Sequence, residues 1–340
     1  FRFDLEKRKI QRIGESSGGF KIAFDNWGHL YETHNLEHIS HLVFEDHYIE
    51  DIPGSPSHAL TNISNHDENG LSRIYPIGEQ DTRVNHPEQS GYFSGACGIT
   101  YYGGGAFPDV FDNSILVADC VLNLVHLDIL SKNGSSFAAT RERDKAEFLA
   151  SSDRSFRPVN MATGPNGALY VVDMHREVIE HPEWIPDELE EKMDLNAGKE
   201  KGRIYRIIPK GQKNSANRPL PSDLKKLVHL LGSDNQWMRT TAQRLLVTQN
   251  KQEAIPLLIR QLENSANPLA RLHSIWTLDG LEALEKRILL SSLEDTSPEI
   301  RENAIKIAEK SLKSDSGFLK PLIALTTDKD ARVRMRASLA

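Results

Sequence analysis

The chain has 340 residues, of which 39% are hydrophobic and 26% are charged, and its formal net charge is −7. These values are typical of a folded globular protein of about two domains, and the negative charge argues against a protein that binds nucleic-acid phosphates. No apolar run reaches the roughly 18 residues that a membrane helix needs.

The first half of the sequence predicts short strands joined by turns. Residues 1–13, FRFDLEKRKIQRI, have the pattern of two outer strands. Three later segments, 19–35, 95–120 and 157–173, each contain an alternating strand, a turn and a buried strand, and a further strand follows each of them. Repeated units of this kind are typical of β-propeller blades.

These segments account for about three blades, whereas closed propellers have about four to eight. We therefore expect a multidomain all-β plus all-α fold, in which residues 1–209 are the C-terminal blades of a β-propeller. We also expect the chain to be a fragment, with the earlier blades of the propeller missing from it.

The two cysteines, Cys97 and Cys120, fall in the paired strands of one predicted hairpin. Counting outward from its loop places them nearly opposite each other. A cross-strand disulfide and two buried thiols are both compatible with this pattern. Two cysteines are too few for a thiolate zinc cage.

Polar residues concentrate at one predicted end of the blades. The loop entering the first strand of a blade and the loop leaving its second strand lie on the same face, so they should meet. The third segment contributes four candidate catalytic residues, Arg157, Asp173, His175 and Arg176. The first two segments contribute four candidate cofactor-binding residues, His34, Asn35, His86 and Asn123. The sequence does not identify a metal site.

The chemistry of these side chains supports two interpretations. His175 or His34 could act as a general base, because histidine titrates near neutral pH. Arg157 and Arg176 could hold an anion, and Asp173 could orient a histidine or bind Ca²⁺. Alternatively, Arg157 pairs with a neighbouring blade, and Asp173 binds the backbone of its own turn.

A long excursion, residues 176–202, separates two strands of the last predicted blade. Its segment IPDELEEKMDL begins with proline and acidic residues, which favours the start of a helix. Such a helix could cover the end of the blades as a lid, or it could be the platform on which the following domain docks.

The second half predicts a different architecture. Residues 210–221 form a polar linker, and residues 222–340 have a helical pattern that repeats. Each repeat has a polar turn, an arginine and an apolar helical stripe, and the arginines are Arg239, Arg271, Arg301 and Arg334. Their spacings of 32, 30 and 33 residues indicate an α-solenoid of stacked helical hairpins resembling HEAT repeats. We expect the arginines to cap turns and to pair with carboxylates of neighbouring repeats.

Three long motifs resemble the membrane-bound dehydrogenase family. They are the stretches 86–126, 148–189 and 197–209, in this order. In that family a β-propeller similar to soluble quinoprotein glucose and sorbosone dehydrogenases precedes HEAT-like repeats, and a cytochrome c domain often follows. The resemblance covers almost the whole chain.

The resemblance implies an exported or periplasmic protein that oxidises a sugar or an alcohol. Pyrroloquinoline quinone and calcium would be its cofactors, and a cytochrome-type acceptor would receive the electrons. This chain has no C-x-x-C-H motif, so the haem would lie outside it. The helical surface could also bind a protein partner.

The main alternative is a binding module without catalysis, in which propeller and repeats together recognise a glycan or a protein. A hydrolase-type propeller with a metal in its channel has less support, since the sequence shows no ring of metal ligands. Similarity of fold does not by itself establish chemistry.

Overall fold

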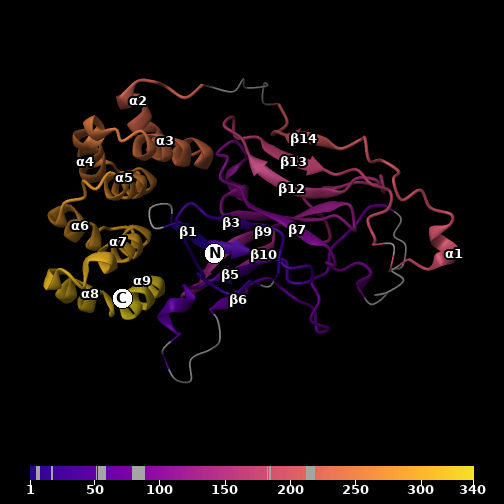
Figure 1. Ribbon diagram of the computed structural model, residues 1–340, viewed down its shortest axis with the longest axis horizontal. Helices are drawn as coiled ribbons and strands as arrows, with labels where there is room; N and C mark the ends of the chain where they lie inside the picture. Colours follow the sequence, from indigo (N-terminus) through magenta and orange to yellow (C-terminus); the bar gives the residue numbers. More distant parts are fainter. Residues whose placement is uncertain are drawn as a thin grey trace.

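A computed structural model describes residues 1–4, 8–16, 18–50, 52, 59–78, 89–181, 183, 185–211 and 219–340. Antiparallel sheets occupy the first part of the chain, and helices occupy the second (Figure 1). This order of β and then α structure agrees with the sequence pattern.

Within the described residues the strands form four antiparallel sheets. A small ribbon pairs β1 (Arg2–Asp4) with β2 (Lys9–Gln11). The first sheet contains β3 (Ile22–Phe24), β4 (Leu30–Glu32), β5 (Ser40–Leu42) and β6 (Leu60–Asn62). The second contains β7 (Ala96–Tyr101), β8 (Ser114–Asp119), β9 (Leu124–Asn133) and β10 (Ser136–Arg141), with β11 (Leu149–Ala150) also paired to β9. The third contains β12 (Pro158–Thr163), β13 (Leu169–Asp173) and β14 (Arg203–Ile207).

Apart from β11, the strands of each of these three sheets are neighbours in chain order, so each sheet is a meander. Tight turns join the first two strands of the first and third sheets. Gly28 and Gly167 occupy the left-handed positions of these turns, with φ of 88° and 79°. Glycine adopts such angles without steric cost, which explains the D-N-W-G and G-P-N-G sequences.

The three sheets stack face to face, as the strand β8 shows. Its residues Ile115 and Val117 lie in one core with Tyr31 of the first sheet. The alternate residues Leu116 and Ala118 lie in a second core that includes side chains of the third sheet. Successive side chains of a strand point to opposite faces, and β8 is buried on both of them, which explains why its four central residues are all apolar.

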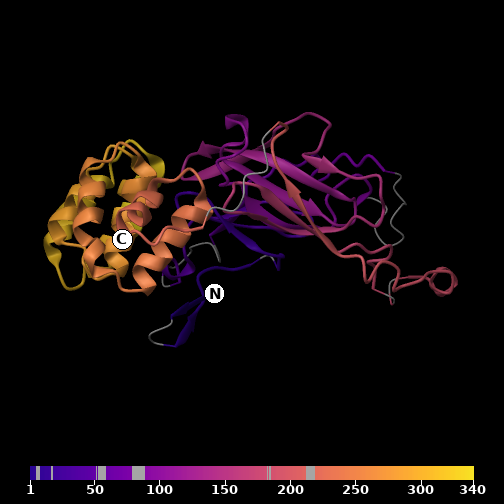
Figure 2. The ribbon, with the colours of Figure 1, turned by 90° about the horizontal axis from the view of Figure 1, so that it is seen from above.

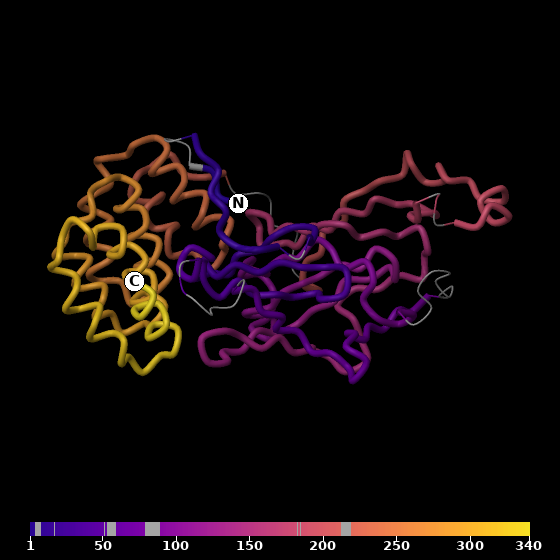
Figure 3. The backbone as a smooth tube through the Cα atoms, turned by 60° about the horizontal axis from the view of Figure 1, so that its bottom comes forward, coloured from indigo at the N-terminus to yellow at the C-terminus, as the bar shows by residue number. Residues whose placement is uncertain are grey.

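The helices follow after residue 219. Apart from the single turn α1 (Asp187–Glu190), they are α2 (Leu224–His229), α3 (Gln236–Thr248), α4 (Ile255–Asn264), α5 (Pro268–Gly280), α6 (Lys286–Leu293), α7 (Pro298–Ser311), α8 (Leu319–Leu325) and α9 (Ala331–Leu339). They share one continuous hydrophobic core. Figure 3 shows this part winding in successive turns toward the C-terminus. No helix in the described ranges is both long and apolar enough to cross a membrane.

The four recurrent arginines make the same backbone contact. Each guanidinium donates to the carbonyl oxygen six residues earlier, at the turn before its helix. Arg271 also forms a two-pronged ion pair with Asp295, with both N–O distances at 2.8 Å. Arg301 pairs in the same way with Asp328, at 2.9 and 2.8 Å. All four arginines therefore cap their turns as expected. The expected ion pair with a carboxylate of the following repeat is found for Arg271 and Arg301.

The helices dock on one end of the stacked sheets, the end with the turns between first and second strands. At the start of α3, the Gln236 N–H donates to the carbonyl of Gly103 at 2.7 Å. The Asn235 side chain donates to the carbonyl of Gly164 at 3.0 Å. Figures 1 and 2 show α1 at the opposite end, far from α2–α9. The excursion 176–202 is therefore not the platform for the helices.

Candidate functional site

The loops predicted to meet at the end of the sheets away from the helices do contact each other. The Met174 N–H donates to the carbonyl of Arg157 at 2.9 Å, and the Arg176 N–H donates to that of Ser155 at 3.1 Å. These two bonds connect the loop before β12 with the loop after β13. Arg157, Asp173, His175 and Arg176 are thereby brought together in space.

The Arg157 guanidinium is buried and fully engaged with backbone. Four of its N–H donors reach carbonyl oxygens at 2.9–3.1 Å, those of Arg176, Glu177, Cys120 and Val121. Burial lowers the pKa of Arg157. Because a guanidinium has five N–H groups, this residue has little capacity left for an anion. It fastens the loop after β13 to the loop after β8.

Asp173 also binds the backbone. Its Oδ1 accepts from the N–H groups of Arg157 and His175, both at 2.8 Å. Asp119 ends β8 in the neighbouring sheet, and its Oδ2 likewise accepts from Ser94 and Gly95 N–H at 3.1 and 3.0 Å. An aspartate at the end of the second strand thus fastens the loops in two successive sheets.

His175 is held in one orientation. Its φ is 52°, and its Nδ1 lies 2.8 Å from the Nη2 of Arg203. Arginine can only donate, so Nδ1 is the acceptor and the neutral ring carries its proton on Nε2. The Arg176 side chain is half-buried. Within the described residues, its one side-chain hydrogen bond is to the carbonyl of His175, at 3.4 Å.

Three of the four candidate cofactor residues lie in the described part of the chain, in two different loops. Asn123 is buried and donates to the carbonyls of Arg154 and Phe156 at 3.1 and 2.5 Å, so it belongs to the same fastened loops. His34 is half-buried and Asn35 exposed, in the loop after β4. His86 lies outside the described residues.

Lys21, which the sequence pattern did not single out, lies where the first strands of the three sheets converge. It directly precedes β3, at a φ of 103°. Its ammonium donates to Thr100 Oγ1 of β7 at 2.8 Å, and to Asn160 Oδ1 and Met161 O of β12 at 2.9 and 2.5 Å. One side chain therefore joins all three sheets.

The electrostatics of Lys21 are unusual for a lysine. Burial lowers its pKa to about 8. The three oxygens that it contacts belong to a hydroxyl, an amide and a peptide group, and all are neutral. These three acceptors use all three N–H donors of the ammonium, so an anionic ligand would have to replace one of them. A half-buried cation without a carboxylate among its acceptors favours that exchange, and its depressed pKa suits proton transfer.

A separate cavity of about 1020 Å³ lies between the sheets and the helices. Trp27 and Trp276 line it together with the amides of Gln236, Gln243 and Asn303. Aromatic faces and amide groups of this kind can bind an uncharged polar ligand.

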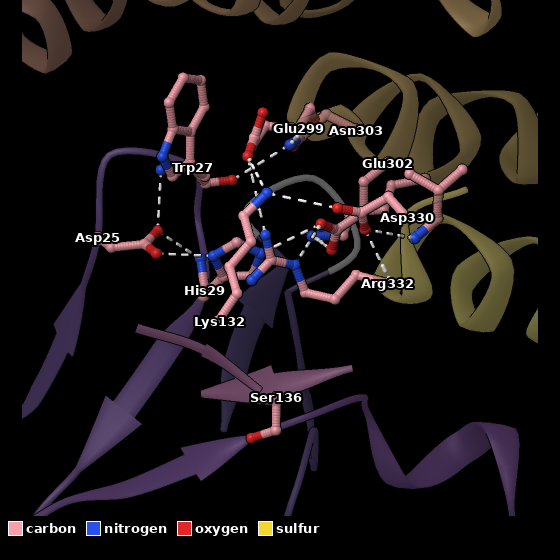
Figure 4. A network of polar contacts seen from close by, with 12 residues as sticks. Asp25, Trp27, His29, Lys132, Ser136, Glu299, Glu302, Asn303, Asp330 and Arg332 are labelled. Atoms are coloured by element: carbon pink, nitrogen blue, oxygen red, sulfur yellow. Dashed lines mark hydrogen bonds and ion pairs between the residues drawn. The ribbon is translucent and has the colours of Figure 1, made fainter. Parts of the chain in front are cut away.

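A buried charged network forms part of the wall of this cavity (Figure 4). His29 Nδ1 lies 2.6 Å from Asp25 Oδ2, and His29 Nε2 lies 3.1 Å from Glu302 Oε2 of α7. Burial alone would lower the pKa of His29, but the charges of Asp25 and Glu302 outweigh it and raise the pKa to about 9. This network connects the first sheet with the helices.

Cys97 and Cys120 are free thiols. Cys97 is buried and Cys120 half-buried, and a hydrogen bond between the two side chains raises the pKa of the Cys97 thiol. Of the two arrangements compatible with the sequence, the structure has the pair of thiols.

Comparison with known families gives one match. The model of a domain of unknown function, DUF7133, matches residues 1–211. The chain belongs to the DUF7133 family. No curated protein matches it.

The DUF7133 match covers all of the described sheets and ends just after β14. It therefore includes Lys21 and the fastened loops around Arg157, but none of the helices α2–α9. DUF7133 is defined without an assigned function, so the match assigns no chemistry to any of these residues.

Proposed function

We propose that the chain is part of a quinone-dependent dehydrogenase that oxidises a sugar or an alcohol. In this proposal the three meander sheets are blades of a β-propeller and the helices are HEAT-like repeats. Support comes from the face-to-face stacking of the sheets and from arginines that recur about every thirty residues with the same contact. The protein would be exported or periplasmic, and a cytochrome-type haem outside this chain would accept the electrons.

Lys21 is the observation that carries the proposal. The first strands of propeller blades line the central channel, and Lys21 lies among the first strands of all three sheets. Its uncompensated ammonium suits a carboxylate of pyrroloquinoline quinone, which would supply the two-electron oxidant when bound. With a pKa of about 8, Lys21 could also accept the hydroxyl proton of the substrate.

The loop cluster supports this chemistry less well. Arg157 donates to backbone carbonyls, and the Nδ1 of His175 accepts from Arg203. Asp173 binds its own loop through Oδ1, and its buried Oδ2 has no hydrogen-bond partner among the described residues but lies 3.6 Å from the Arg203 guanidinium, so a calcium ion there would meet a positive charge. We therefore assign positioning roles to these residues and the ligand contact to Lys21.

Quinone binding tests the proposal. The protein is produced from the reading frame that contains this chain, and pyrroloquinoline quinone is added while its absorbance and the protein fluorescence are followed. We expect binding in the native protein and at least about tenfold weaker binding in Lys21→Gln, since losing one charged contact costs about 1.5–3 kcal/mol. The exposed Lys192→Gln is the matched control. Equal quinone binding in both variants, or none in the native protein, would refute the proposal.

Reduction of an artificial dye with a panel of sugars and alcohols then identifies the substrate. The second candidate function is a binding module without turnover, which the cavity of about 1020 Å³ with Trp27 and Trp276 favours. Saturable binding on a glycan array, weakened by Trp276→Ala and unaccompanied by dye reduction, would support that alternative.

A further inference from the structure

Two histidines and an aspartate converge between the first and second sheets. His38 lies just before β5, and His126 and Asp128 lie on the same face of β9. His38 Nε2 is 2.9 Å from Asp128 Oδ2, and His126 Nε2 is 2.9 Å from Asp128 Oδ1. All three side chains are buried, and one ligand atom from each lies within 4.8 Å of the others.

A second carboxylate fixes the orientation of His126. Its Nδ1 lies 2.7 Å from Glu147 Oε2. The other oxygen of Glu147 accepts from Arg141 at 2.8 Å and from the backbone N–H of Tyr75 at 2.9 Å. A carboxylate that binds the outer nitrogen of a histidine leaves the inner nitrogen for a metal, which is the usual arrangement around protein metal ions.

His38 is positioned by packing. Its ring stacks on Phe93, with ring centres 4.4 Å apart, and stands edge-on to His126, with ring centres 5.1 Å apart. Its Nδ1 is buried and has no hydrogen-bond partner in the part of the chain that the structure describes. Coordination through Nε2 would therefore break only the bond to Asp128.

The cluster borders a small cavity of about 150 Å³, which Ser72, Arg73 and Tyr75 also line. Such a space can hold several waters. It leaves room for a water or a small anion beside the three side chains, as an open coordination position requires.

We propose that His38, His126 and Asp128 bind one divalent transition-metal ion of the Zn²⁺ type. Around a tetrahedral ion with bonds of about 2.0–2.2 Å, ligand atoms lie roughly 3.3 Å apart, so small side-chain rotations suffice. A metal-bound imidazole is neutral and keeps one N–H, so His126 would keep the proton on Nδ1 toward Glu147 and release the Nε2 proton to solvent. The Nε2 proton of His38 would move to its Nδ1. Nitrogen donors favour zinc, cobalt or nickel over calcium, which prefers oxygen.

Metal titration of the chelator-treated full chain tests this site. Zn²⁺ is followed by calorimetry, Co²⁺ by its visible d–d absorption, and bound metal by elemental analysis. We expect one ion per chain, no response to Ca²⁺, and loss of the Co²⁺ spectrum in Asp128→Asn. Glu147→Gln should weaken Zn²⁺ binding about 10- to 100-fold, as removal of an outer carboxylate typically does.

His41→Gln is the matched control. His41 is equally buried on β5, but its Nδ1 contacts Ser136 rather than the cluster. We expect its Zn²⁺ affinity to stay within about twofold of the native value, while circular dichroism checks the fold of every variant. If Asp128→Asn does not fold, the Co²⁺ spectrum of the native chain and the Zn²⁺ affinity of Glu147→Gln still test the site. No Co²⁺ absorption in the native chain, or equal affinities in Glu147→Gln and His41→Gln, would overturn the site.

Discussion

His29 and Glu302 are 273 residues apart in the chain, yet His29 Nε2 lies 3.1 Å from Glu302 Oε2. Both side chains are almost completely buried. Figure 4 shows that their contact is part of a larger network, in which Lys132 also reaches Glu299 at 2.7 Å and Asp330 at 3.3 Å. Charged contacts between the sheets and α7 and α9 therefore hold the two parts of the chain together.

The first prediction concerns Glu302→Gln. Removing this charge leaves the imidazolium of His29 and the nearby Arg332 guanidinium buried with less compensation. Breaking a buried ion pair from one side costs about 3–5 kcal/mol. We expect a loss of that order in the free energy of unfolding, measured by urea denaturation.

Glu294→Gln is the control for this experiment, because Glu294 is exposed directly after α6. Its effect should stay within about 0.5 kcal/mol, as is usual for surface substitutions. Similar urea midpoints for the two variants would contradict the importance of the network.

The second prediction is a loss of stability at alkaline pH. His29 has a pKa of about 9 in the folded chain, against about 6.5 when unfolded. Its contribution is therefore complete below about pH 6.5 and disappears as the pH rises through about 9. We expect His29→Gln to cost more stability at pH 6 than at pH 9.5, measured by urea unfolding at both values. An equal cost at the two values would contradict the raised pKa.

The third prediction is a loss of stability at acid pH, caused by two buried histidines. Burial is the main cause that lowers the pKa of His41 and of His273 to about 3. Both rings stay neutral in the folded chain while they protonate in the unfolded chain below about pH 6.5. Stability should thus fall as the pH falls from 6.5 toward 3. Urea unfolding at several pH values across this range gives the number of protons taken up on unfolding. We expect this number to be about one smaller in His273→Asn.

Local patterns in the sequence are sufficient to predict the strands, the helices and the turn contacts of the recurrent arginines. Alternation and turn residues depend on near neighbours, and the pairing of Arg271 with Asp295 spans only 24 residues. The meeting of the loops around Arg157 and Asp173 also follows, since strand connectivity determines which loops share an end of a sheet.

The roles of these residues could not be predicted in the same way. Arg157 contacts carbonyl oxygens, which every residue possesses, so no sequence signal marks its partners. Lys21 contacts residues about 80 and 140 positions away. For the proposed metal site a signal did exist: His126 and Asp128 lie two residues apart in the otherwise apolar segment 124–130, which places both on one buried face.

The fourth prediction separates a positioning role of Arg157 from a catalytic one. Arg157→Lys replaces a guanidinium with five N–H groups by an ammonium with three, so it cannot serve all four carbonyls. Buried carbonyls left unpaired cost about 1–3 kcal/mol each. We expect this variant to lose about 3 kcal/mol in urea unfolding and to keep its quinone affinity. Arg176→Gln should lose less than about 0.5 kcal/mol, because Arg176 makes one long contact. Full stability together with lost quinone binding in Arg157→Lys would instead favour direct contact with the ligand.

The fifth prediction compares two of the recurrent arginines. Arg301 and Arg334 both donate to the carbonyl six residues earlier, but only Arg301 forms a two-pronged pair with Asp328, and Arg334 is exposed. Arg301→Met should leave a nearly buried carboxylate and a turn carbonyl without their donor. We expect it to lose about 3 kcal/mol in urea unfolding.

Arg334→Met makes the same substitution at a solvent-exposed position. We expect it to lower the free energy of unfolding by less than about 1 kcal/mol. The contrast matters because the arginines look equivalent in the sequence. Equal losses in the two variants would mean that the turn contact alone stabilises each repeat. A larger loss for Arg301 would mean that its pair with Asp328 connects successive repeats, so that destabilising one turn propagates to the neighbouring helices.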